Sequence, residues 1–116
     1  MLMTNMTFTK GIGSPKYMAP EVLFKEKYKM PSDIFSFAIT MYEILSWKSA
    51  YPKSDFKFPW KIAEFITSGK RLEQHELISS ELFKIIQLAW CQKPSERLKI
   101  EDVVSMLETE VIKTNL

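Results

Sequence analysis

Side chains that commonly carry out chemistry are scarce in this sequence. It contains one cysteine, Cys91, and one histidine, His75. A single cysteine allows neither an intrachain disulfide nor a zinc site built from cysteines. Because Cys91 follows Trp90 in an apolar segment, we expect a buried structural thiol rather than a nucleophile. None of the 3 glycines forms the Gly-x-Gly-x-x-Gly pattern that covers nucleotide phosphates. The sequence therefore predicts no metal site and no nucleotide site of its own.

The composition indicates a globular domain without a membrane segment. The 116 residues are 46% apolar and 26% charged, which suits one domain with a hydrophobic core. Basic and acidic residues are interspersed and give a net charge of only +2, so no nucleic-acid partner is indicated. The most apolar stretch, residues 35–45, is too short to cross a bilayer and contains Glu43. No secretory signal is visible either, and we expect a cytoplasmic location.

The elements that must position any site are helices. Apolar periodicity predicts about five of them and no strand, at residues 20–25, 33–46, 60–68, 79–91 and 100–111. The second is apolar on almost every side, which predicts a helix in the middle of the fold. Ser32 is expected to cap this helix and Gly69 to end the third. Either Ser79 or Ser80 is expected to cap the fourth. The fold class is mainly α.

Three motifs follow one another along this helical frame. Residues 13–21 read Gly-Ser-Pro-Lys-Tyr-Met-Ala-Pro-Glu, residues 32–38 read Ser-Asp-Ile-Phe-Ser-Phe-Ala, and residues 90–97 read Trp-x-x-Lys-Pro-x-x-Arg. In this order they resemble the C-terminal lobe of eukaryotic protein kinases. They are similar to the end of the activation segment, the start of the central helix and the segment that joins the last two helices. The resemblance covers about residues 9–107.

The resemblance implies roles for particular residues. Glu21 would form a buried ion pair with Arg97, which pins the activation segment to the helices behind it. Asp33 would accept hydrogen bonds from the catalytic loop, or serve only as a charge at a helix N-terminus. Trp90 would be a further structural anchor. The residues of the shelf that receives the protein substrate would be Gly13, Ser14, Pro15, Lys16, Tyr17 and Met18. The candidate phosphorylation sites of the activation loop would be Thr4, Thr7 and Thr9.

The resemblance also implies a division of the chain and a reaction. Residues 1–21 would be the end of the activation segment with the substrate shelf, and residues 22–116 the helical part of the lobe. A complete kinase would use ATP and Mg²⁺. Ser14 and Tyr17 favour Ser/Thr specificity within the tyrosine-kinase-like group. This sequence lacks His-Arg-Asp, Asp-Phe-Gly and the phosphate-binding Lys segment, so we expect no tight ATP binding and no phosphate transfer by this chain alone.

Two functional hypotheses compete, and an unrelated helical domain is a third. The chain is part of a protein kinase whose upstream half lies outside this sequence, or it is a catalytically dead binding module or truncated remnant. The module would bind a partner through the helix that contains Trp60. The expected partners are a protein substrate or the missing upstream half. Without that half, Phe35, Phe37 and Ile39 or their neighbours on the central helix are expected to be exposed and to favour self-association.

Overall fold

The prediction of a mainly α fold is confirmed. The computed structural model of the chain describes residues 15–24 and 30–114. That part of the chain contains no strand. Its elements, in order, are η2 (Pro15–Tyr17), α2 (Pro20–Leu23), α3 (Met30–Ser46), α4 (Pro59–Thr67), α5 (Ser80–Ala89), η3 (Pro94–Glu96) and α6 (Ile100–Thr114). The two short 3₁₀ turns, η2 and η3, are the elements that periodicity did not reveal.

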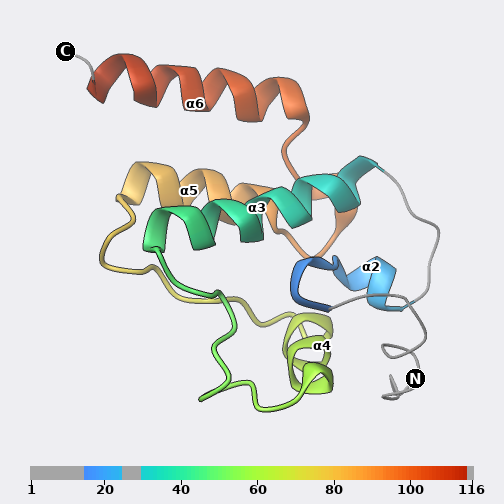
Figure 1. Cartoon of the computed structure of the whole chain (residues 1–116). Coiled ribbons are helices and arrows are strands. Elements are labelled where there is room, and N and C mark those ends of the chain that lie inside the picture. The colour runs from blue at the N-terminus through green and yellow to red at the C-terminus, as the bar shows by residue number, and fades with distance from the viewer. Residues whose placement is uncertain (1–14, 25–29, 115–116) are drawn as a thin grey trace.

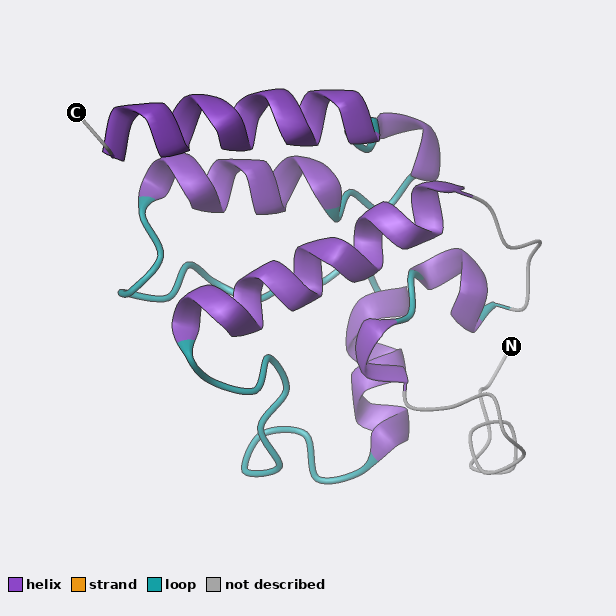
Figure 2. Ribbon diagram, turned by 45° about the horizontal axis from the view of Figure 1, so that its top comes forward, coloured by secondary structure: helices purple, strands orange, loops and turns teal. Residues whose placement is uncertain are grey.

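The longest helix, α3, lies in the middle of the arrangement (Figure 1). The views of Figures 1 and 2 agree that α5 runs beside α3 and that α6 lies beside α5. On the other side of α3, α4 lies near η2 and α2. The segment 15–23 is therefore held between α3 and α4, far in sequence from the C-terminal helices. None of the helices of the described ranges is both long and apolar enough to pass through a bilayer.

The core is built on one side of α3. Phe35, Ala38 and Ile39 are fully buried, and they belong to the same hydrophobic core as Ile85 and Ile86 of α5, the helix that packs beside α3. The expected exposure of Phe35 and Ile39 is therefore wrong, because this chain covers them itself. Phe37, in contrast, is 36% exposed.

Helix α3 lies in the middle of the fold (Figure 1), as predicted from its apolar residues, but it is not buried on every side. Met30, Phe37 and Ile44 are spaced seven residues apart, which places them on one side of the helix, and all three are exposed. We call these three residues the α3 stripe. The apolar residues of α3 therefore lie on two faces of the helix, one packed in the core and one exposed to solvent.

Helix ends agree with the sequence at α4 and α5 but not at α3. Ser79 caps α5 by accepting a hydrogen bond from the Leu82 N–H at 3.2 Å. Gly69 follows α4 with a φ of 92°, the left-handed region that glycine adopts readily. Helix α3 begins at Met30, so Ser32 lies inside it and is not its cap.

Candidate functional site

A bidentate ion pair joins α2, near the start of the described residues, to the segment that follows η3. Pro20 occupies the first turn of α2, where its missing N–H costs nothing, and Glu21 follows it in the same turn. Arg97 directly follows η3. Its Nη1 donates to Glu21 Oε2 at 2.7 Å and its Nη2 donates to Glu21 Oε1 at 2.8 Å. The structure therefore pairs Glu21 with Arg97, as the resemblance implies.

This pair is buried, and both side chains also form hydrogen bonds with other groups of the protein. Glu21 is 7% exposed and Arg97 is 6% exposed. The Ser32 hydroxyl donates to Glu21 Oε2 at 2.7 Å, which ties α2 to α3. The guanidinium lies 5.1 Å from the centre of the Phe35 ring. Its other hydrogen bonds go to the backbone carbonyls of Cys91 (2.8 Å), Pro31 (2.8 Å) and Gln92 (3.3 Å). Such saturation is what a buried ion pair needs in order to offset its loss of hydration.

The protonation of Glu21 is set by opposing effects. Burial by itself would raise the pKa of the carboxyl group. Hydrogen bonds from Arg97 and Ser32 and the positive charge of Arg97 outweigh burial and hold the pKa of Glu21 below its ordinary value. Glu21 is therefore ionised at neutral pH, and the pair is a true ion pair.

The described part of the expected substrate shelf is fixed to α3. Pro15 is fully buried, whereas Tyr17 is exposed at 39%. The Ser36 hydroxyl of α3 donates to the Tyr17 carbonyl at 2.5 Å. The Tyr17 hydroxyl donates to Glu43 Oε1, also at 2.5 Å. Gly13 and Ser14 lie outside the described residues, as do Thr4, Thr7 and Thr9.

Glu43 is the polar centre below this shelf. Its Oε2 accepts a hydrogen bond from the Ala50 N–H at 2.8 Å and lies 4.0 Å from Lys16 Nζ. The hydrogen bond to Glu43, partial burial and the negative charge of Glu43 raise the pKa of the Tyr17 phenol. Sequence reasoning did not assign a role to Glu43. The signal was a single carboxylate within an apolar helical stretch, which requires a polar partner once the helix packs.

Two expected anchors differ in their environment. Trp90 is 4% exposed, and its ring centre lies 6.0 Å from those of Tyr42 and Phe83. Asp33 is exposed, and no hydrogen bond or ion pair within the described part of the chain reaches its carboxylate. In this structure Asp33 is a charge in the first turn of α3. Cys91 is half-buried rather than fully buried as expected.

Arg71 is an anchor that sequence reasoning missed. Its Nε donates to the Trp90 carbonyl at 2.7 Å, and its Nη2 donates to Gln92 Oε1 at 2.8 Å. The guanidinium lies 5.0 Å from the Phe35 ring centre. Two arginines, Arg71 and Arg97, therefore both contact the central aromatic ring of α3. Arg71 lies in a polar connection after Gly69, where nothing in its spacing distinguishes it from a surface residue.

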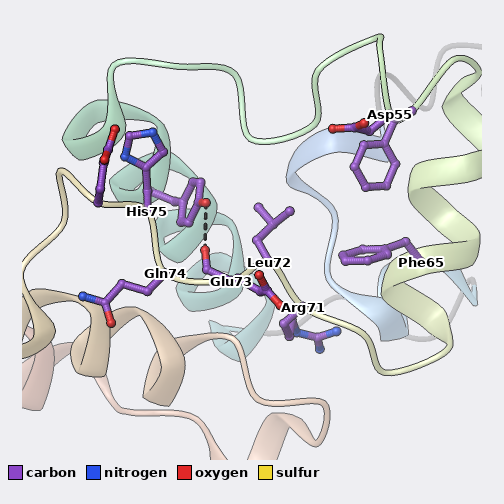
Figure 3. A pocket seen from close by; sticks show the side chains of 10 residues that line it. Asp55, Phe65, Arg71, Leu72, Glu73, Gln74 and His75 are labelled. Carbon is purple, nitrogen blue, oxygen red and sulfur yellow. Dashed lines mark hydrogen bonds between the residues drawn. The ribbon is translucent and has the colours of Figure 1, made fainter.

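Arg71 also borders the hollow shown in Figure 3, about 640 Å³ in volume. Across this hollow the Tyr42 hydroxyl donates to the Glu73 carbonyl at 2.9 Å. His75 and Asp55 lie on its rim (Figure 3). Within residues 15–24 and 30–114, no three His, Cys, Asp or Glu side chains converge as metal ligands. At this hollow, Arg71 and the Tyr42 hydroxyl are already engaged in the fold.

Comparison with known proteins agrees with the three motifs. Residues 4–107 match the family described as protein tyrosine and serine/threonine kinase. The chain is 33% identical over 101 residues, 87% of its length, to the RGS domain-containing serine/threonine-protein kinase A of Dictyostelium discoideum. It is 33% identical over 92 residues (79% of the chain) to a putative serine/threonine-protein kinase/receptor of Acanthamoeba polyphaga mimivirus. It is 31% identical over 99 residues (85% of the chain) to the fibroblast growth factor receptor 1 of Dugesia japonica.

These relatives are much longer than the chain. The matched regions are 9%, 5% and 11% of the respective relatives. The chain therefore corresponds to a small part of each relative, and the family match at residues 4–107 includes the Glu21–Arg97 pair and the shelf.

Proposed function

The chain belongs to the protein tyrosine and serine/threonine kinase family as part of a protein kinase domain, and we propose that it supplies the substrate shelf of that domain and holds the shelf in place. In the complete domain, the γ-phosphate of ATP passes to Ser or Thr residues of a protein substrate. The work of this part is positioning, which is a major component of catalysis in phosphoryl transfer.

The buried Glu21–Arg97 pair is the observation that carries this proposal. Glu21 is the last residue of the segment 15–21. Its bonds to Ser32 and Arg97 hold that segment against α3 and against residues 91–97. The hydrogen bonds of Ser36 and Glu43 fix the other end of the segment. A shelf held at both ends keeps a substrate peptide in register, and small displacements are costly in transfer reactions.

The support for Ser/Thr over Tyr comes from two shelf residues. Ser14 is a small hydroxyl residue, and Tyr17 follows it three positions later. Relatives named as serine/threonine kinases and relatives named as growth factor receptors both match this chain, so their names do not distinguish the two specificities. We also propose the cytoplasm as the location, where protein substrates and ATP are available.

The residues of this chain do not fit ATP and Mg²⁺. The sequence has no glycine-rich phosphate loop and no Asp-Phe-Gly. Arg71, the cation at the hollow of Figure 3, donates to the carbonyls of Ile66, Lys70 and Trp90 and to Gln92. We therefore assign nucleotide binding to an upstream half of the domain and derive no step of transfer in this chain.

A chimaeric kinase tests the proposal. Residues 13–107, which include the whole shelf, would replace the matching segment of the Dictyostelium relative, and phosphate transfer would be compared on peptides that differ only in Ser, Thr or Tyr as acceptor. We expect transfer to Ser and Thr peptides, and at least a tenfold loss when Glu21→Gln releases the shelf. A soluble, cooperatively melting chimaera that transfers phosphate to none of the peptides would favour the catalytically dead binding module instead.

The isolated chain provides a second arm of the same test. Titration with a fluorescent ATP analogue in the presence of Mg²⁺ should show no saturable binding. A stoichiometric binding curve would contradict the assignment of nucleotide binding to the upstream half, whatever the result with the chimaera.

A further inference from the structure

Trp47 has a backbone conformation that its side chain disfavours. Its φ is 58°, and it is the one residue other than glycine with positive φ in the described ranges. In this region a Cβ crowds the following carbonyl oxygen, so glycine is usual there. Packing does not offset the cost, because Trp47 is 87% exposed. Trp47 directly follows the last residue of α3, a position where a left-handed residue commonly ends a helix, so the chain places an exposed tryptophan at the end of the central helix where glycine would serve.

The Trp47 side chain does not stand alone. Ile44, one helical turn earlier on α3, is 64% exposed. Together they border a shallow depression of about 550 Å³ beside the shelf. We call it the Trp47 depression; its lining residues are Lys16, Glu43, Ile44, Trp47, Lys48 and Ser49. A concave site with an exposed tryptophan at its edge has the composition of an interaction hot spot.

Charge indicates what the Trp47 depression binds. The Glu43 carboxylate is already engaged by Tyr17, Ala50 and Lys16. Lys48, in contrast, is exposed, and no carboxylate of the described residues lies within ion-pair distance of it. The available charge at the rim is therefore positive and lies next to an apolar surface.

We propose that the Trp47 depression binds an acidic segment of another protein. An apolar side chain of that segment packs on Trp47 and Ile44, and neighbouring carboxylates lie near Lys48. Because the depression shares Lys16 with the shelf, this interaction deepens the proposed function and rests on it, but the binding itself requires neither ATP nor phosphate transfer. A membrane surface is the less favoured partner, since the apolar side chains line a depression, whereas a bilayer presents a flat surface.

Fluorescence anisotropy on the full chain tests this proposal. The probe is a fluorescein-labelled peptide, Glu-Asp-Glu-Phe-Leu-Glu-Asp-Glu. The first comparison peptide has lysine in place of every acidic residue, and the second has serine in place of Phe-Leu. We expect the acidic peptide to bind at least tenfold more tightly than either. Equal affinity for the three peptides would overturn the proposal, as would binding to phosphatidylserine vesicles but not to the acidic peptide.

Two variants locate the site. Trp47→Gly should weaken binding at least tenfold while the melting temperature stays the same or rises, because glycine suits the positive φ. Lys48→Glu should weaken binding at least fivefold. Leu77→Ala is the matched control, because Leu77 is an exposed apolar residue outside the depression, and it should leave affinity unchanged. Unchanged binding in both Trp47→Gly and Lys48→Glu would exclude the depression as the site.

Discussion

At the scale of single residues, the ion pair of Glu21 and Arg97 has the largest structural consequence. The two residues are 76 positions apart, yet two hydrogen bonds join their side chains away from solvent. Removing one partner would leave the other charge buried without compensation, which costs far more than breaking a surface pair. Ser32 and Phe35 of α3 contact the same pair, so its loss would also loosen the central helix.

We predict that Glu21→Gln lowers the free energy of unfolding by about 3–5 kcal/mol, because it leaves the Arg97 cation buried and unpaired. Urea unfolding of the variant and the parent chain, followed by circular dichroism, would measure the difference. Lys113→Gln is the control, since it breaks an exposed pair with Glu110 and should cost less than about 1 kcal/mol. Similar losses in the two variants would contradict a buried, compensated pair at Glu21.

The lowered pKa of Glu21 predicts a pH dependence of known sign. The folded state favours ionised Glu21, so this stabilisation is fully present above the ordinary pKa of 4.5. It is lost progressively as the pH falls below 4.5 and through the lower pKa of the folded state. The stability difference between the parent chain and Glu21→Gln should therefore shrink over that range. A difference that stayed constant down to pH 2 would show that the Glu21 carboxyl is not the titrating group.

At the scale of elements, the helices follow local signals more closely at their cores than at their ends. The extents of α4 and α5 agree with periodicity, because a repeating apolar face is a property of adjacent residues. Adjacent serines at positions 79 and 80 left the cap of α5 undecided. The structure assigns the cap to Ser79, while the Ser80 hydroxyl lies 3.5 Å from Gln74 Nε2.

We predict that Ser79→Ala lowers the free energy of unfolding by about 1 kcal/mol, because the Leu82 N–H loses its acceptor. Ser80→Ala is the matched control one residue later and should change it by less than about 0.5 kcal/mol. Thermal melts of both variants would measure the two effects. A larger loss for Ser80→Ala would move the cap to Ser80.

At the scale of the whole molecule, the α3 stripe remains open. Met30, Phe37 and Ile44 are 71%, 36% and 64% exposed along one side of the longest helix. An apolar row of this length on a central helix favours contact with another surface. We propose that in isolation the chain associates through this stripe.

We predict concentration-dependent association of the isolated chain and its reduction by Phe37→Glu, which places a charge in the middle of the stripe. Sedimentation velocity at several concentrations would measure it. Leu77→Glu is the control, because Leu77 is exposed outside the stripe. A monodisperse monomer at all concentrations would exclude association through the stripe. Phe37 lies outside the Trp47 depression, so this result is separable from peptide binding.

Much of this protein was determined by the sequence alone. The helices follow from apolar periodicity, the end of α4 from Gly69, and the family from three motifs in order. The Glu21–Arg97 pair was reached through the resemblance to kinases, since no local pattern relates two residues that far apart. These features depend on neighbouring residues or on short motifs, and both are visible in a linear chain.

Only the tertiary structure decided the remaining features. It placed Ser32 within α3 as a donor to Glu21, packed Arg71 against the Phe35 ring, and left Met30, Phe37 and Ile44 exposed. The positive φ of Trp47 also came from the structure, because its residue type argues against that conformation. The physical reason is common to all of these. Burial, hydrogen-bond partners and strained backbone angles depend on which distant segments pack together, and periodicity in one segment does not specify its neighbour.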